Sequence, residues 1–263
     1  RAALSRPALR FNEVVSRVVN AMSDRLTLSI PVEVLDDGEL IKDAHVLASE
    51  HLLAISDNRV GFFHEAFFDY AFARLWMART DSMVNFLTAS EQELFRRAQV
   101  RQVLQYLSAR DVQRFRAEVD TLLRCSEIRF HIKETVLAVV ANVAVPAADD
   151  VELMVEIAAT HPRWEERLWQ QLRRPQWFTQ FNAAGYLNRW LDSPDEDLRN
   201  RAINFMMSSM RECPAAVAVL LSARRESPHY GAWVRWLMRF ADLQDNRELF
   251  QLMLDAVRRS EEH

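Results

Sequence analysis

The chain has 263 residues, of which 49% are apolar and 27% charged, and its formal net charge is −4. These values allow a sizeable buried core, and they argue against a disordered chain and against a general nucleic-acid-binding protein. No apolar run approaches the roughly 20 residues that span a bilayer, so we expect no membrane attachment.

The chain contains only four glycines, and no two of them lie close together. Nucleotide-binding loops need clustered glycines, because only glycine lets backbone amides approach a phosphate closely. GxxxxGK[ST] and GxGxxG are both absent. We therefore expect no nucleotide hydrolysis by this chain alone, and we predict no catalytic residue, no metal site and no cofactor within it.

The two cysteines, Cys125 and Cys213, are isolated from each other and from metal-ligand spacings. Such usage is typical of a reducing compartment, and we predict a cytoplasmic protein. The chain starts at Arg1 without a methionine. We interpret it as a piece of a longer polypeptide.

The first 63 residues alternate helical and extended patterns. Apolar spacing predicts a helix over 11–21, a short extended segment over 26–31 and a second helix over 37–53. A turn cluster then divides residues 54–63 into two short apolar runs, which predicts a hairpin. Helix, short strand, helix and hairpin is the element order of a winged-helix module, and we assign residues 1–80 to it.

Residues 81–263 are predicted to form a helical-repeat domain. A helix is expected over 64–79, and apolar periodicity predicts further helices over 81–89, 91–108, 111–124 and 127–144. Pro146 to Asp150 forms a break with helix-capping residues.

From residue 146 onward, prolines punctuate the sequence regularly. Pro162, Pro194 and Pro228 are separated by 32 and 34 residues, and each is expected to open a helix. Second helix starts fall between them, near Pro175, Pro214 and Gln244-Asp245. A helix pair of about 33 residues is the repeat expected of an α-solenoid. We therefore predict HEAT-like helix pairs, with an irregular helical bundle as the alternative.

One segment, residues 60–74, carries the most specific pattern in the chain. An apolar strand ends at His64, where a helix begins, and the amides of a first helical turn attract anions. The segment resembles the end of the winged-helix domain in STAND-type P-loop NTPases of the NACHT and NB-ARC kind. The matching residues are Phe62, Phe63, His64, Glu65, Phe67, Asp69, Tyr70 and Ala73.

The resemblance implies a role for His64. In such proteins the histidine at this position contacts the β-phosphate of ADP and helps to hold a closed, inactive state. Phe63, Glu65, Asp69 and Tyr70 support the motif. An ATPase core in the same polypeptide would then bind ATP or ADP with Mg. The helical repeats would recognise a partner protein or ligand, in defence or signalling.

Other interpretations remain open. The chain could be a stand-alone helical-repeat scaffold for protein–protein interactions, without any link to a nucleotide. His64 could be a packing or capping residue. DNA binding through the winged helix is disfavoured, because the second helix carries Asp37, Asp43 and Glu50 with only Lys42 as a cation.

The remaining polar clusters have mostly structural interpretations. Asp149-Asp150 and Asp195 to Asp197 fall in first helical turns, where carboxylates complement the helix dipole. Arginines and tryptophans alternate in the repeats and could line a groove for a partner, although core packing is the preferred use of the tryptophans. They include Trp164, Trp169, Trp177, Trp190, Trp233, Trp236, Arg173, Arg174, Arg224 and Arg225.

Overall fold

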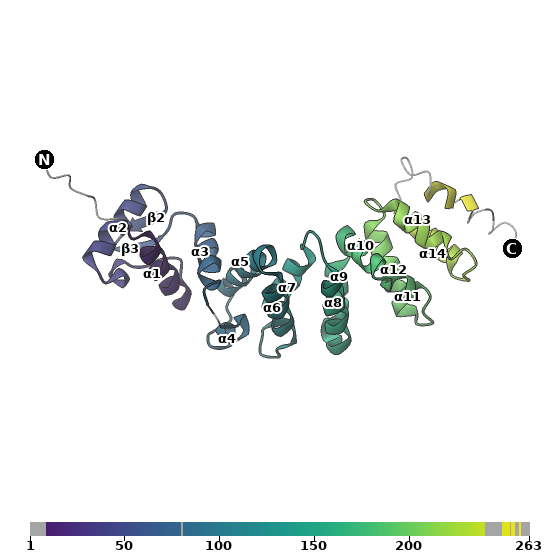
Figure 1. The fold of residues 1–263 in the computed structure, drawn as a ribbon, viewed down its shortest axis with the longest axis horizontal. Coiled ribbons are helices and arrows are strands. Elements are labelled where there is room, and N and C mark those ends of the chain that lie inside the picture. The colour runs from purple at the N-terminus through teal and green to yellow at the C-terminus, as the bar shows by residue number, and fades with distance from the viewer. Residues whose placement is uncertain (1–8, 80, 240–248, 253, 256–257, 259–263) are drawn as a thin grey trace. The chain divides into compact units, whose positions relative to one another are not determined.

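The computed structural model describes residues 9–79, 81–239, 249–252, 254–255 and 258. In Figure 1 these residues form a mainly α-helical chain with one small antiparallel sheet. This confirms the predicted all-α class with a short hairpin. The contacts divide the chain into two compact units, unit 1 (Arg1–Val139) and unit 2 (Val140–His263).

Unit 1 begins with the predicted succession of helix, strand, helix and hairpin. Its sheet has the order β1-β3-β2, and both neighbouring pairs are antiparallel. A short 3-10 helix, which the sequence did not indicate, follows the first strand. The elements are α1 (Phe11–Asp24), β1 (Ile30–Pro31), η1 (Val32–Leu35), α2 (Gly38–Ser49), β2 (Leu53–Ser56) and β3 (Arg59–Phe62).

The hairpin between β2 and β3 closes through a two-residue turn. Ser56 pairs with Arg59, and the turn residues Asp57 and Asn58 have φ of 49° and 57°. Two successive residues with positive φ match the right-handed twist of the strands, and Asn and Asp tolerate this conformation better than most residues. The predicted turn cluster is therefore present, and it is as tight as a hairpin allows.

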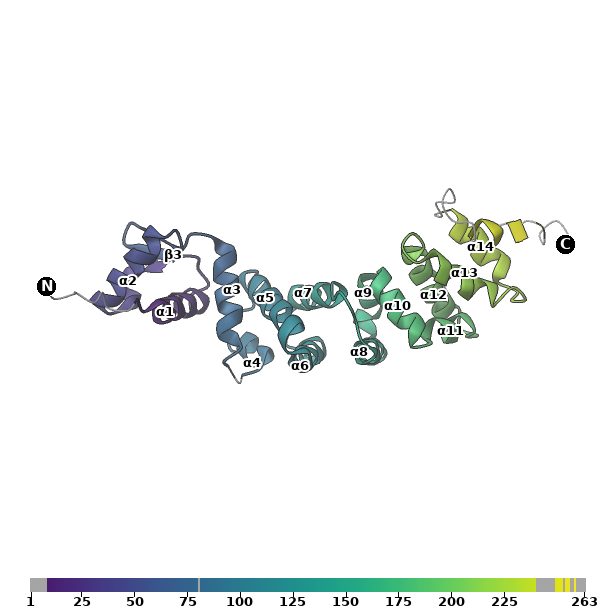
Figure 2. The same ribbon diagram turned by 45° about the horizontal axis from the view of Figure 1, so that its top comes forward.

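Helix α3 (Glu65–Trp76) connects the sheet region to the helices that follow it. It contacts α1 and β3 as well as α5 (Phe95–Arg110), as Figure 2 shows. Its buried aromatic side chains, Phe68, Phe72 and Trp76, supply the apolar area for this packing. The winged-helix-like region and the next helices consequently belong to one compact unit, which extends past residue 80, where we placed a domain boundary.

The rest of unit 1 consists of α4 (Met83–Thr88), α5, α6 (Val112–Arg124) and α7 (Phe130–Ala141). Helix α5 starts four residues later than the prediction of 91. The side chain of Gln92 explains this, because it donates to the carbonyl of Glu127 at 2.9 Å and accepts from the amide of Arg129 at 2.8 Å. These bonds hold the segment before α5 against the turn before α7.

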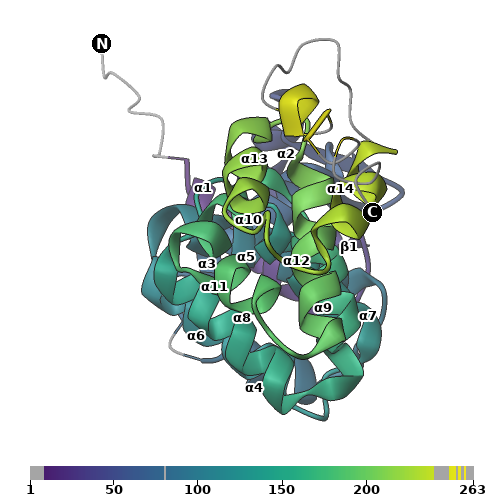
Figure 3. The same cartoon turned by 90° about the vertical axis from the view of Figure 1, so that its right-hand side faces the viewer.

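Unit 2 contains the helices α8 to α14, which are labelled in Figure 3. Within this unit α12 contacts α10, α11, α13 and α14. The helices are α8 (Ala148–Thr160), α9 (Pro162–Leu172), α10 (Pro175–Ala183), α11 (Tyr186–Leu191), α12 (Glu196–Ser209), α13 (Pro214–Ser222) and α14 (Tyr230–Met238).

The prolines mark helix starts largely as predicted. Pro162, Pro175 and Pro214 each occupy the first helical position. Pro194 and Pro228 instead lie two residues before α12 and α14 begin. The start expected at Gln244-Asp245 lies outside the described residues.

One predicted helix is interrupted. Gly185 has φ of 76° and separates α10 from α11. A residue in the left-handed region ends the regular helix, and glycine adopts it without steric cost. The helix pair that starts at Pro162 therefore contains three helical segments.

Side-chain hydrogen bonds reveal a regular spacing from Met77 onward. Many of them join residues that are 32 to 38 positions apart, in unit 1 and in unit 2 alike. This interval agrees with the helix-pair length of about 33 residues predicted from the prolines. The agreement favours a helical-repeat arrangement over an irregular bundle, and it places repeat-like contacts in unit 1 as well.

Candidate functional site

His64 occupies the N-cap position of α3. Its backbone is extended, with φ of −117° and ψ of 122°, and its exposed side chain caps no amide of the helix. The His64 carbonyl accepts from the amide of Phe67 at 2.9 Å. The imidazole therefore lies at the start of α3 but forms no hydrogen bond with the amides of its first turn.

The rings of His51, Phe63 and His64 lie in a chain of contacts. The Phe63 ring, which is 51% exposed, meets the His64 imidazole edge-on at 4.8 Å between centroids. The Phe63 ring also lies 5.4 Å from the ring of His51. We refer to His51, Phe63 and His64 as the ring cluster. His51 was not indicated by the sequence, because it precedes the β2–β3 hairpin while the other two residues follow it.

The other motif residues lie along α3 and make different contacts. The Tyr70 ring is 6.4 Å from the ring of Tyr106 in α5. Asp69 is half-buried, and this burial raises the pKa of its carboxyl group. Glu65, one turn earlier, raises that pKa further, while Arg101 of α5 opposes the change. The described contacts of Asp69 and Tyr70 thus point toward α5, whereas those of His64 are with Phe63.

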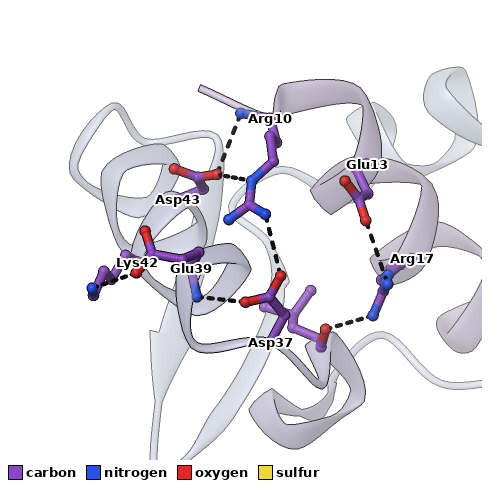
Figure 4. Close-up of polar contacts among 8 residues, drawn as sticks. Arg10, Glu13, Arg17, Asp37, Glu39, Lys42 and Asp43 are labelled. Atoms are coloured by element: carbon purple, nitrogen blue, oxygen red, sulfur yellow. Dashed lines mark hydrogen bonds and ion pairs between the residues drawn. The ribbon is translucent and has the colours of Figure 1, made fainter. Parts of the chain in front are cut away.

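Carboxylates dominate the polar contacts of α2, the helix that a winged-helix protein would present to DNA. Arg10 lies between two of them, donating from Nε to Asp43 at 3.0 Å and from Nη1 to Asp37 at 3.2 Å (Figure 4). Asp37 also accepts from the amide of Glu39 at 2.8 Å. The hydrogen bond from the Glu39 amide, together with Arg10, lowers the pKa of the Asp37 carboxyl group.

The lysine of α2 is also engaged with a carboxylate. Lys42 Nζ lies 2.6 Å from a carboxylate oxygen of Glu39. The contacts in Figure 4 therefore tie α2 to the start of α1, and they pair both Arg10 and Lys42 with carboxylates. A surface whose cations are already paired with carboxylates is poorly suited to neutralise DNA phosphates.

The alternating arginines and tryptophans of unit 2 serve mainly the core. Trp169 and Trp177 are fully buried. Arg201 stacks on Trp169 at 4.6 Å and also forms an ion pair with Glu165. Such contacts account for these residues by packing, which was their preferred interpretation.

Two clefts in the described residues carry both charged and aromatic groups. One, of about 430 Å³, lies between α12 and α14 and is lined by Glu196, Arg199, His229, Trp233 and Trp236 among others. The other, of about 440 Å³, lies within unit 1 and is lined by Asp24, Arg79, Asp81, Asn85, Phe86 and Arg96, among others. We name the second the Arg79–Arg96 cleft.

The sequence did not single out the Arg79–Arg96 cleft, because its residues come from α1, α4, α5 and the segments on either side of α4. One signal was available. Arg96 and Gln99 continue the apolar stripe of α5 that includes Val103 and Leu107, so a cation stands at a position where a core residue is expected.

Among the described residues, no group of three or more His, Cys, Asp or Glu side chains could hold a metal ion. Within the same residues, none of the helices combines the length and apolar character needed to cross a bilayer.

Comparison with known proteins adds no assignment. No family model, no curated protein and no solved structure matches this chain. Any function therefore has to be argued from its own residues and from the resemblance of residues 60–74.

Proposed function

We propose that this chain is a regulatory region of a STAND-type NTPase, in which the winged-helix-like module presents His64 to a bound nucleotide. The supporting observation is the exposed His64 side chain at the N-terminus of α3, where it caps no helical amide. A capping residue would be expected to bond to the first turn, so the capping interpretation loses its main support.

The chemistry of this position suits a phosphate. The first turn of α3 contributes a partial positive charge, and an imidazole N–H can donate to a phosphate oxygen. The Phe63 ring, edge-on to His64 at 4.8 Å, restricts the directions in which the imidazole can point. The phosphate loop, the Mg ligands and the nucleotide itself would come from an ATPase core of the same polypeptide.

Helix α3 would couple partner binding on the helical repeats to the nucleotide at His64. This helix contacts α1 and β3 as well as α5, so the element that presents His64 also packs on the first repeat-like helices. A partner that binds the helical repeats would act by favouring one of two arrangements of α3 over the other. Nucleotide release and partner binding would then be thermodynamically coupled.

Calorimetric titration of the full-length polypeptide with ADP tests the proposal. We expect His64→Ala to weaken ADP binding by about tenfold or more, because a hydrogen bond to a charged group contributes about 1.5–3 kcal/mol. His45→Ala is the matched control, since His45 is exposed on α2 in the same module. Equal ADP affinity for the wild type and His64→Ala would remove the nucleotide role.

A second candidate function is a protein-interaction scaffold with no nucleotide link. The cleft between α12 and α14, which combines Arg199 and His229 with Trp233 and Trp236, favours it. The same titration separates the two functions. A full-length polypeptide that binds neither ADP nor ATP would leave the scaffold as the function.

A further inference from the structure

We propose that the Arg79–Arg96 cleft binds a small zwitterion of the α-amino-acid class. This inference does not depend on the proposed nucleotide role, because the cleft shares no residue with the ring cluster. It rests on a buried cation that forms no ion pair within the described part of the chain, on a second cation beside it, and on carboxylates that line the same cleft.

The first element is Arg96, whose guanidinium donates hydrogen bonds to neutral side chains. The residue is 2% exposed. Nη1 donates to Ser23 Oγ at 2.9 Å and to Gln99 Oε1 at 2.8 Å, and Nη2 donates to Ser90 Oγ at 3.1 Å. Arg96 forms no ion pair with any described carboxylate, and its buried Nε has no hydrogen-bond partner among the described residues.

Such an arrangement is costly unless something compensates for it. A charge taken out of water loses several kcal/mol of hydration, which a paired carboxylate normally restores. Burial accordingly lowers the pKa of Arg96, and Arg79 lowers it further while Asp24 opposes them. Since a guanidinium stays charged in proteins, the cleft holds a fixed cation that a ligand carboxylate could neutralise.

The second element is Arg79, which shares an aromatic ring with Arg96. The guanidinium carbon of Arg96 lies 4.4 Å from the centroid of Phe86, and that of Arg79 lies 6.0 Å from the same centroid. Arg79 donates to Asn20 Oδ1 at 3.2 Å, and among the described residues its other guanidinium N–H groups have no hydrogen-bond acceptor. Two guanidinium groups therefore lie at one aromatic ring that lines the cleft.

The third element decides the class of ligand. Asp24 and Asp81 line the same cleft as the two arginines, so the formal charges of its lining cancel. A simple anion such as phosphate would gain from the arginines but would be repelled by the carboxylates. A zwitterion can place its carboxylate at the arginines and its ammonium group at the aspartates.

Size and apolar lining fit the same class. The cleft of about 440 Å³ falls within the range of small-molecule sites, about 300–1,000 Å³. Phe86 and Ala89 also line the cleft and give it an apolar part, where an amino-acid side chain can lie.

The test uses the 263-residue chain and the twenty proteinogenic L-amino acids, each added separately. We expect at least one amino acid to raise the melting temperature and to give saturable heat in calorimetry, while acetate, phosphate and methylammonium do neither. Arg79→Gln should weaken the binding of that amino acid by about tenfold or more. Asp81→Asn should weaken it through the ammonium group, and Arg110→Gln, an exposed arginine at the end of α5, should not change it.

Several results would overturn the proposal. A panel in which no amino acid binds would do so, as would binding that Arg79→Gln and Asp81→Asn both leave unchanged. Acetate or phosphate binding as tightly as the best amino acid would show an anion site instead. Circular dichroism of Arg79→Gln must match the wild type, and Asp81→Asn provides an independent measurement if it does not.

Discussion

Arg224 holds both carboxylate oxygens of Asp192, with Nε···Oδ1 and Nη2···Oδ2 distances of 2.7 Å each. The same guanidinium donates to the carbonyls of Leu220 at 3.0 Å and of Asn188 at 3.1 Å. Its side chain is 8% exposed, whereas that of Asp192 is 63% exposed. One arginine thus connects the end of α11 to the last turn of α13.

Replacing this arginine tests how much the connection contributes. We expect Arg224→Lys to lower the free energy of unfolding by about 1–3 kcal/mol, because an ammonium group cannot form two parallel bonds to one carboxylate. Urea denaturation measures the change, and Arg211→Lys, an exposed arginine in the same unit, is the control. Equal stability of Arg224→Lys and the control would show that the paired geometry contributes nothing.

Glu118 is a buried carboxylate of α6 that contacts the start of α4. One of its oxygens accepts from the amide of Met83 at 2.9 Å. Burial raises the pKa of Glu118 above its ordinary value of 4.5, although the Met83 amide and Arg114 oppose the change. The folded protein therefore disfavours the ionised form. This group's contribution to stability is greatest below its ordinary pKa and falls as the pH rises through the raised pKa of the folded protein.

Glu118→Gln should show this dependence, because glutamine keeps an acceptor for the Met83 amide but does not ionise. We expect the stability of the variant relative to the wild type to increase between pH 4.5 and about pH 7. Urea denaturation at both pH values measures it, with Glu91→Gln as the exposed control. A relative stability that stays constant or falls over this range would contradict the prediction.

Gly61 in β3 allows close contact with the chain before β1. A Cβ atom at this position would lie 2.5 Å from the carbonyl oxygen of Leu28, whereas one at Gly38 would meet nothing within 4 Å. We expect Gly61→Ala to reduce the free energy of unfolding by about 1–3 kcal/mol, because a backbone segment must shift. Gly38→Ala is the matched control and should be neutral or slightly stabilising. Similar thermal unfolding of both variants would argue against the close approach.

DNA binding is expected to be absent. The α2 surface carries Asp37, Asp43 and Glu39, and its neighbouring cations are paired with them. Fluorescence anisotropy with a short labelled duplex at physiological salt should therefore show no saturable change. An increase in anisotropy would contradict this prediction if added salt weakens it and Lys42→Ala reduces it. Such a result would support a role for α2 in DNA recognition.

Much of the fold was predictable because local signals determine it. Apolar periodicity located the helices of unit 1, and the Ser56-Asp57-Asn58 cluster located the hairpin turn. The prolines located most helix starts in unit 2. The 3-10 helix after β1 and the break at Gly185 were missed, because one short turn or one glycine produces too little periodic signal.

The sites were less predictable, because they depend on contacts between distant segments. His64 could be named from a local motif, but His51, which contacts Phe63, lies at the other end of the β2–β3 hairpin. Arg96 bonds to Ser23, 73 residues earlier, and no sequence spacing indicates such a contact. Whether His64 binds a nucleotide and whether the repeats bind a partner stay predictions.

The hydrogen bonds that join residues 32 to 38 positions apart have a consequence for how such a chain can change. Duplicating or deleting one whole helix pair preserves the donor–acceptor offsets in the remaining helix pairs. An insertion of a few residues inside a helix pair shifts one hydrogen-bonding partner out of reach of the other. Lineages of this protein should therefore differ in length by complete helix pairs. The number of helix pairs can change without any rearrangement of the other pairs.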